Sequence, residues 1–402
     1  MKLGVYVQTW HVGGVAAFCE RLARGLHQVG HAPCVILATP FGKRDDAGRK
    51  AYQALVSNRP FPVCCLHLSA FHPKERAWRA TERIAALGCD ALILSSHGPL
   101  AGAWARLCLD IPIIGIAHND DEDTYAEFKA CAAYCDAYVA VSKAIYQRLK
   151  LLAETKSPTR VCHIPYGVSL QAAPDAGSQS SEVRVLVVCR LEQGQKRVLD
   201  LPLIWQEYRR MGGKGTLSLC GSGPQETQLR QAFAKELAQG GVNILGAVPL
   251  DKMPEVYARH DVLLSVSAYE GLPISVLEAT THGLFPLLSA IRSGHQEIVD
   301  AVGSGRLCPM ADSSGFASAL LEITTDLQAL RQLRPLIQSK ARSLFDPERM
   351  AQNYSHLVAE VYEARTTGRP RQRSASNTRP KVDFLRSFLR KWQYSRHYGW
   401  QD

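Results

Sequence analysis

Two glutamates in the stretch YEGLPISVLEA, Glu270 and Glu278, are the side chains of this sequence that most need a chemical explanation. A carboxylate among Leu, Ile and Val is costly to bury without a partner, but it binds sugar and ribose hydroxyls well. Gly271 permits a tight turn and Pro273 suits the first turn of a helix, so Glu270 is expected before a helix and Glu278 on it. Because the unpaired N–H groups of a helix start attract anions, the pattern predicts a site for a ligand with phosphates and hydroxyls. The alternative is a capping acid followed by a surface glutamate.

Two cations in the stretch VLVVCRLEQGQKRVLDL support a phosphate site. Arg190 directly follows an apolar run, and Lys196 lies six residues later at the start of a helical pattern. Together they could hold a pyrophosphate as charge develops on it, although such residues alone are usually solvated. A glycine turn with Gly221 and Gly223 precedes Pro224, which is weak evidence because it also suits close packing.

The N-terminal half offers a second glycine turn and a histidine. Gly13 and Gly14 follow the first apolar run, where backbone can approach a phosphate. The third glycine of a dinucleotide fingerprint is lacking, and no acid closes the next strand, so NAD binding is disfavoured. His118 follows the run IPIIGIA, and the acids 120–123 after it are more typical of solvated or helix-capping residues than of a metal site.

Short apolar runs alternate with helical patterns along the chain, which predicts parallel sheets covered on both faces. The helical pattern GVAAFCERLARGLHQVG ends at Gly30. The predicted strands are KLGVYVQ, PCVILAT, PVCCLHL, DALILSS, IPIIGIA and DAYVAVS in the first half, and VRVLVVC, GTLSLCG, VNILG, DVLLSVS and LFPLLSA in the second.

A polar, small-residue stretch near 168–182 separates the two series of strands and reads as a linker. Ligands of such folds bind at the carboxyl ends of the strands, so we expect a ligand between two facing domains. The expected organisation is 1–167 as the first domain, 168–182 as the linker, 183–345 as the second domain, 346–365 as a closing helix and 366–402 as a basic tail.

Composition describes a soluble globular chain of 402 residues, 46% hydrophobic and 21% charged. No apolar run is long enough to cross a membrane and no secretory signal is recognisable, so a cytoplasmic location is expected. The twelve cysteines are dispersed, and Cys131 and Cys135 lack a second ligand pair, which favours reduced core thiols over zinc. The net charge is +10, of which residues 365–402 contribute ten Lys or Arg against two Asp, leaving +2 for the rest.

The motifs occur in an order that resembles the retaining glycosyltransferases of the GT-B fold, family 4, from about Gly13 to Tyr362. The segments that carry the resemblance are GG at 13–14, LHQVGH, IAHND at 116–120, DAYVAVS at 136–142, IPYGV at 164–168, Arg190 with Lys196, GSGP at 221–224 and YEGLPISVLEA. The resemblance implies an α/β chain with two Rossmann-like domains whose parallel sheets face a central cleft. Three departures from the family pattern are the six-residue interval between the two cations, Ser293 in place of a glycine, and Asn119 after the histidine.

By this resemblance, Glu270 would contact donor-sugar hydroxyls, Glu278 would hold the ribose, and Arg190 and Lys196 would neutralise the diphosphate. His118 would touch the sugar near its 6-position, and Gly14 would face the phosphates. The implied catalytic residues are His118, Glu270, Arg190 and Lys196. The implied donor-binding residues are Gly14, Arg190, Lys196, Gly221, Glu270, Gly271, Leu272, Pro273, Ile274 and Glu278.

The implied activity is transfer of a sugar, with retention, from a UDP- or GDP-sugar to a glycan or lipid-linked acceptor of cell-surface polysaccharide or lipopolysaccharide. The leaving diphosphate oxygen would take the acceptor's proton, with no metal ion and no cofactor. A phosphorylase would need a pyridoxal-phosphate lysine site, and none is convincing. A non-catalytic sugar-nucleotide-binding scaffold, recruited to a membrane by the tail, is the remaining alternative.

The tail segment KVDFLRSFLRKWQYSRHYGW places apolar residues at helical spacing with Arg and Lys on the remaining surface. A basic amphipathic helix suits an anionic membrane, which predicts peripheral docking through residues 365–402 on the inner face of the cytoplasmic membrane. A helix that packs on the enzyme or a partner protein is an equal alternative, and no nucleic acid partner is expected.

Overall fold

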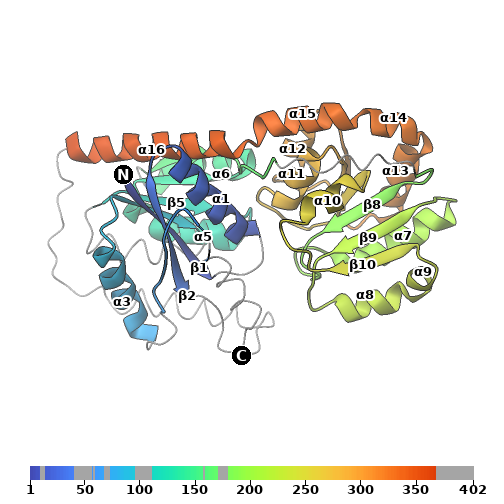
Figure 1. Cartoon of the computed structure of the whole chain (residues 1–402), viewed down its shortest axis with the longest axis horizontal. Coiled ribbons are helices and arrows are strands. Elements are labelled where there is room, and N and C mark those ends of the chain that lie inside the picture. The colour runs from blue at the N-terminus through green and yellow to red at the C-terminus, as the bar shows by residue number, and fades with distance from the viewer. Residues whose placement is uncertain are drawn as a thin grey trace. The chain divides into compact units, whose positions relative to one another are not determined.

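The computed structural model describes residues 1–9, 14–39, 57, 59–67, 73–95, 111–156, 159–170 and 180–367. Residues Met1–Tyr362 form one compact unit that contains two parallel sheets (Figure 1). The predicted α/β fold with two Rossmann-like domains is therefore confirmed. Gly13, most of the linker and the tail from 368 lie outside the described residues.

Within the described residues, the N-terminal sheet has seven parallel strands in the order β3-β2-β1-β4-β5-β6-β7. Its strands are β1 Lys2–Thr9, β2 Ala32–Thr39, β3 Val63–Cys65, β4 Ala91–Ser95, β5 Ile113–Ala117, β6 Ala137–Ala140 and β7 Arg160–His163. Every residue of β4, β5 and β6 is buried, so both faces of the sheet are covered, as the continuous apolar runs predict.

The C-terminal sheet has six parallel strands in the order β10-β9-β8-β11-β12-β13. Its strands are β8 Arg184–Val188, β9 Thr216–Cys220, β10 Val242–Gly246, β11 Val262–Ser265, β12 Phe285–Ser289 and β13 Arg306–Cys308. The strand order reverses between β8 and β11 here, and between β1 and β4 in the first sheet. Ligands of open α/β sheets bind at such switch points, beyond the carboxyl ends of the strands.

The helices connect these strands and cover the sheets. In the part of the first domain that the structure describes they are α1 Gly14–Gln28, α3 Pro73–Ala86, α5 Glu122–Cys131, the 3₁₀ turn η2 Ala132–Tyr134 and α6 Lys143–Lys156. In the second domain they are η3 Val198–Asp200, α7 Leu201–Arg210, α8 Glu226–Ala232, α9 Ala234–Ala238, α10 Met253–Ala258, α11 Ile274–Thr281, α12 His295–Val302, α13 Ser313–Thr325, α14 Leu327–Gln332 and α15 Arg334–Leu344.

The last helix, α16 (Pro347–Thr367), returns to the N-terminal domain, where Figure 1 shows it beside α1 and α6. The ring of Tyr354 lies 6.2 Å from that of Phe18 on α1, and a Cβ at Gly25 would touch Ala351. The N-terminal core therefore includes residues of β1 and α1 together with residues of α16, from the two ends of the unit Met1–Tyr362. The closing helix was predicted at 346–365, two residues short of its observed end.

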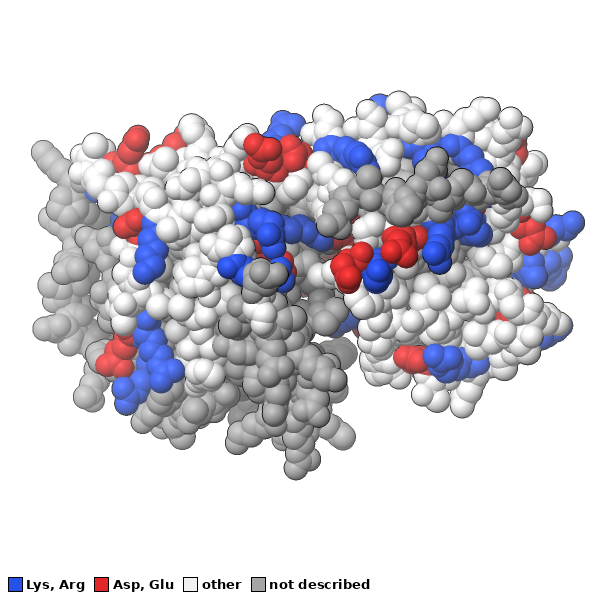
Figure 2. All heavy atoms as spheres, in the orientation of Figure 1, with Lys and Arg blue, Asp and Glu red and all other residues white. Residues whose placement is uncertain are grey.

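Two strands were not predicted, β7 and β13, and both lie at sheet edges. They are three or four residues long and mix polar with apolar positions, so they lack a periodic signal. Among the described residues, no helix is both long and apolar enough to span a bilayer. Figure 2 shows acidic and basic side chains interspersed over the drawn face, in keeping with the small net charge of the body.

Candidate functional site

Glu270 and Lys196 form the centre of the candidate site. Glu270 follows β11, and its side chain is only 8% exposed. The Nζ of Lys196, whose side chain is 16% exposed, lies 2.6 Å from the Oε1 of Glu270. A carboxylate and an ammonium that are both withdrawn from water require such pairing. The pair lies beyond the carboxyl ends of β8 and β11, at the switch point of the C-terminal sheet.

Arg190 joins this pair through a residue that sequence reasoning missed, Gln195. An Nη2–H of Arg190 donates to Gln195 Oε1 at 3.1 Å, and Gln195 Nε2 donates to Glu270 Oε2 at 3.4 Å. The Arg190 side chain is 61% exposed, so its remaining N–H groups are open to a ligand. The loop between Arg190 and Lys196 is one residue longer than is common in the family, and Glu192 stabilises its turn. The Glu192 carboxylate accepts hydrogen bonds from the backbone N–H groups of Gln195 and Lys196 at 3.1 Å.

Glu278 lies on α11 with different partners. It is paired with Arg21 of α1, and it accepts a hydrogen bond from the Tyr257 hydroxyl at 2.9 Å. Burial raises the pKa of Tyr257 well above its usual value, so this hydroxyl stays protonated and keeps donating. The structure therefore brings Lys196 and Glu270 together directly and Arg190 through Gln195, but holds Glu278 in a separate cluster.

His118 is buried, and its carbonyl oxygen lies close to Gly271. Its Nε2 lies 2.7 Å from the Ser95 hydroxyl at the end of β4, and its Nδ1 contacts the Tyr166 hydroxyl. Burial lowers the pKa of His118 to about 3, so its imidazole is neutral near pH 7.

The pH dependence of His118 can be stated with its sign. In the unfolded chain its pKa is about 6.5, so below that pH the unfolded state binds a proton that the folded state does not. The stability that this residue contributes is complete above about pH 6.5 and is lost as the pH falls toward 3. We expect the His118 imidazole signals in an NMR titration to stay constant from pH 8 to 5; a midpoint near 6.5 would contradict its burial.

Gly271 makes a backbone contact between the two domains. It pairs with Asn119 in an antiparallel bridge, and a Cβ at this position would overlap the carbonyl oxygen of His118. The following residues, Leu272 and Pro273, lead into α11, which begins at Ile274. A Cβ at Gly14, the first residue of α1, would lie 3.3 Å from the Ile274 Cδ1. The starts of α1 and α11 therefore meet.

Gly221 follows β9 and has a φ of +139°. A Cβ there would overlap the carbonyl oxygen of Cys189, the residue before Arg190. Glycine is thus required for the approach of the two strand ends.

The other two departures from the family pattern, Ser293 and Asn119, lie at the contact between the two domains around Gly271. The Ser293 hydroxyl donates to the Gly271 carbonyl at 2.9 Å and lies 2.7 Å from the Ser142 hydroxyl of the first domain. Asp120, the residue after Asn119, pairs with Arg292 through two hydrogen bonds, of which the Nε one is 2.8 Å. Asp121 caps α5 by accepting the Thr124 N–H at 2.8 Å. The acidic cluster therefore serves an ion pair and a helix cap.

Metal-like clusters are not seen in the described ranges, where no three His, Cys, Asp or Glu residues gather in a way that could hold an ion. Cys131 and Cys135, whose spacing raised the question, are buried cysteine thiols. Burial raises the pKa of the Cys131 thiol, which suits a core residue.

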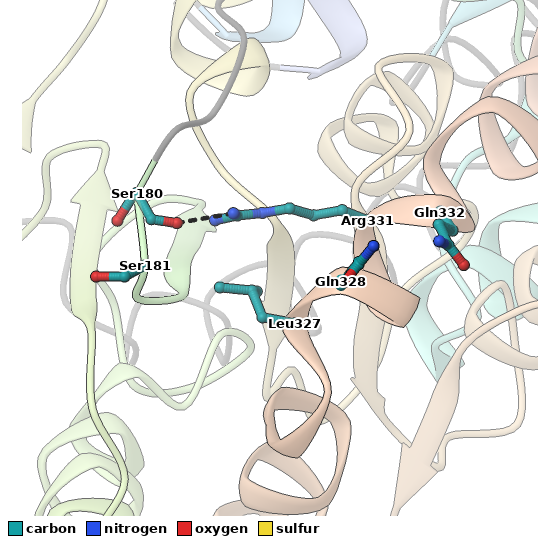
Figure 3. A pocket seen from close by; sticks show the side chains of 6 residues that line it. All are labelled: Ser180, Ser181, Leu327, Gln328, Arg331 and Gln332. Carbon is teal, nitrogen blue, oxygen red and sulfur yellow. Dashed lines mark hydrogen bonds between the residues drawn. The ribbon is translucent and has the colours of Figure 1, made fainter.

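A hollow of about 490 Å³ lies away from these residues, next to α14 (Figure 3). Arg331 crosses it to donate to the Ser180 carbonyl at 2.7 Å and to the Asp261 carboxylate at 3.0 Å. Asp261 also accepts the backbone N–H of Arg184. These residues precede or begin strands β8 and β11, so the hollow lies at the end of the sheet opposite Glu270. The contacts of Arg331 across it have a structural role, because they hold α14 against the starts of these strands.

Comparison with known families matches both halves of the chain. The family described as Glycosyltransferase Family 4 matches residues 12–172, and the one described as Glycosyl transferases group 1 matches residues 182–326. Between them they cover most of the chain, and their boundary falls within the predicted linker.

Curated relatives are similar over part of their length. The lipopolysaccharide 1,6-galactosyltransferase of Escherichia coli K12 is 28% identical over 55% of this chain and 60% of its own. The amylovoran biosynthesis glycosyltransferase AmsK of Erwinia amylovora is 29% identical over 35% of this chain and 36% of its own. The chain thus spans about a third to three fifths of the length of these relatives.

Solved structures show the same fold at low identity. Sucrose-phosphate synthase of Thermosynechococcus elongatus superposes with a TM-score of 0.74 at 18% identity, covering 90% of this chain and 99% of its own. Anabaena HepE, solved with UDP and glucose, gives 0.72 at 17% identity, covering 90% of this chain and 100% of its own. The two-domain architecture is that of these GT-B proteins.

Proposed function

We propose that this chain, with its two glycosyltransferase-family domains, is a retaining enzyme that transfers a sugar from a nucleotide-sugar to a glycan or lipid-linked acceptor. The observation that carries the proposal is the Lys196–Glu270 pair, linked through Gln195 to Arg190 at the switch point of the second sheet. Cations for a diphosphate and a carboxylate for hydroxyls are thereby held within one cluster, as a nucleotide-sugar requires.

In this proposal the diphosphate lies against Arg190 and Lys196. An ammonium has three N–H donors, and Glu270 accepts from one of them, so Lys196 can contact a phosphate without leaving its partner. The backbone N–H groups of Gly271 and Leu272, which precede α11, and of Ile274, which begins it, face the same negative charge. Gly14 contributes backbone at the start of α1.

The sugar and the ribose are assigned to the two glutamates. Glu270 accepts hydrogen bonds from the hydroxyls of the donor sugar, and neutral His118 contacts that sugar from the first domain. Glu278 accepts from the ribose hydroxyls while Arg21 and Tyr257 hold it in place. Gly221 permits the close approach of strand ends behind Arg190.

The chemical step proposed is a same-face substitution at the anomeric carbon. The bond from that carbon to the diphosphate oxygen breaks, the acceptor oxygen bonds to the same face, and the acceptor's proton passes to the leaving diphosphate. Arg190 and Lys196 stabilise the charge that develops on the diphosphate, a role that in this proposal requires no metal ion.

A uridine or guanosine diphosphate sugar is the proposed donor, and cell-surface polysaccharide or lipopolysaccharide the proposed product class. The names of the relatives support the product class, and the UDP in HepE supports a uridine donor. The basic tail is proposed to bring the enzyme to an anionic membrane that carries the acceptor.

A thermal-shift panel of UDP-, GDP- and ADP-sugars tests the donor site. A donor at 100 times its Kd should stabilise the folded chain by about 2.7 kcal/mol. Glu278→Ala should lose most of that gain, measured against its own melting temperature without donor. Glu278→Gln, which keeps an acceptor for Tyr257, controls for loss of folding, and Glu322→Ala on α13 is the exposed matched control. A full shift in Glu278→Ala would refute the role of this residue.

A further inference from the structure

We propose that Gln195 is a positioning residue that fixes the Glu270 carboxylate relative to Arg190, and so the donor sugar relative to its diphosphate; this rests on the proposed function. Its amide oxygen accepts from Arg190, and its amide nitrogen donates to Glu270 Oε2 and to the Tyr269 carbonyl at 3.1 Å. One side chain thus connects the loop after β8 with the loop after β11.

The residue itself is held at several points. It is only 9% exposed, and its carbonyl accepts the backbone N–H of Ala268 at 2.7 Å. Its own backbone N–H donates to the Glu192 carboxylate. Because backbone and side chain both contact the 268–270 segment, Gln195 cannot turn without moving one of the two loops.

The carboxylate of Glu270 is fixed by two different groups. Oε1 accepts from Lys196 and Oε2 accepts from Gln195, so both oxygens have a donor and the plane of the carboxylate is defined. Lys196 alone would leave rotation about that single contact. A reacting group displaced by about 1 Å can cost about 10²-fold in rate.

The amide group suits this position because it is both donor and acceptor while carrying no charge. It accepts from a guanidinium and donates to a carboxylate without cancelling the positive charge that a diphosphate needs. A glutamate would place a second carboxylate against Glu270, and a methionine of similar length would supply neither a strong donor nor a strong acceptor.

The test compares Gln195→Met with Gln193→Met in the full chain. Gln193 lies in the same loop and accepts the backbone N–H of Leu199 at 2.9 Å, so it controls for general loosening of the loop. Steady-state transfer is measured with the nucleotide-sugar found in the donor panel, and binding is measured calorimetrically for that donor and for its nucleoside diphosphate alone.

Gln195→Met should lower kcat about 100-fold. It should also weaken binding of the nucleotide-sugar more than binding of the nucleoside diphosphate alone, because the cations remain but the sugar is misplaced. Gln193→Met should leave that ratio of affinities unchanged. Gln195→Asn, which keeps the amide but is too short to span both partners, gives the same readout if Gln195→Met folds poorly.

If the wild type transfers sugar and Gln195→Met does so within threefold, the positioning role is wrong while the function stands. An equal loss in Gln193→Met would also overturn it, because the effect would then belong to the loop. If the wild type itself neither binds nor transfers any nucleotide-sugar, the proposed function fails and this inference fails with it.

Discussion

Replacing Lys196 with methionine is expected to lower kcat for sugar transfer by about 10²–10³-fold. The variant keeps the aliphatic stem but removes a positive charge from the proposed diphosphate site, and loss of one preorganised electrostatic contact typically costs this much. It also leaves Glu270, whose side chain is 8% exposed, without its ion-pair partner. Breaking a buried pair on one side costs about 3–5 kcal/mol of stability, so the variant should also melt at a lower temperature.

A double variant separates these two effects. In Lys196→Met/Glu270→Gln both members of the pair are neutral, so the melting temperature should recover most of the loss. Transfer should not recover, because the charge at the diphosphate is still missing and Glu270, assigned to the donor sugar, has lost its own charge. Lys252→Met is the matched control, since Lys252 pairs only with the exposed Glu255 on α10 in the described contacts. Transfer by Lys196→Met within tenfold of the wild type would contradict the role assigned to this ammonium.

Most of the strands, and the elements that carry the proposed site residues, could be predicted from sequence because they depend on local signals. The run VRVLVVC contains β8, whose central residues are buried, and Arg190 follows the strand after one intervening residue, Cys189. Pro273 and the apolar residues after it place Glu278 on α11. Since parallel strands end at one edge of their sheet, sequence also predicts Arg190 and Glu270 at the same edge, where Gln195 links them, whereas Glu278 lies in a separate cluster.

The partners of the site residues could not be predicted in the same way. Arg21 lies 257 positions before Glu278, and nothing in the amphipathic pattern of α1 indicates which acid it meets. Gln195 is one polar residue of a polar loop, and only the approach of the loop after β11 gives it a function. These contacts arise from tertiary packing, which residue types and spacing do not encode one by one.

The departures from the family pattern illustrate the same point. At the level of sequence, Ser293 replaces a glycine and Asn119 separates the histidine from an acid. In the structure, Ser293 donates to the Gly271 carbonyl and Asn119 pairs with Gly271. Both departures from the motif therefore contact the backbone of the same glycine, Gly271.

Gly271→Ala is accordingly expected to have a large effect on transfer with a smaller effect on folding. The added Cβ would overlap the His118 carbonyl oxygen, a backbone atom that cannot rotate away. The loop must shift, which breaks the bridge to Asn119 and displaces the neighbouring Glu270. Overpacking of this kind costs about 1–3 kcal/mol of stability, whereas a displaced catalytic group costs about 10²-fold in rate.

Gly240→Ala provides the comparison for this prediction. Gly240 has a φ of +72° and open space around its Cβ position, so alanine there is strained by about 1 kcal/mol but displaces no neighbour. It lies between α9 and β10, remote in sequence from every proposed site residue, and its transfer rate should equal that of the wild type. Urea unfolding and initial rates on both variants decide the matter. If Gly271→Ala loses only as much activity as Gly240→Ala, the domains do not depend on this backbone contact to align His118 with Glu270.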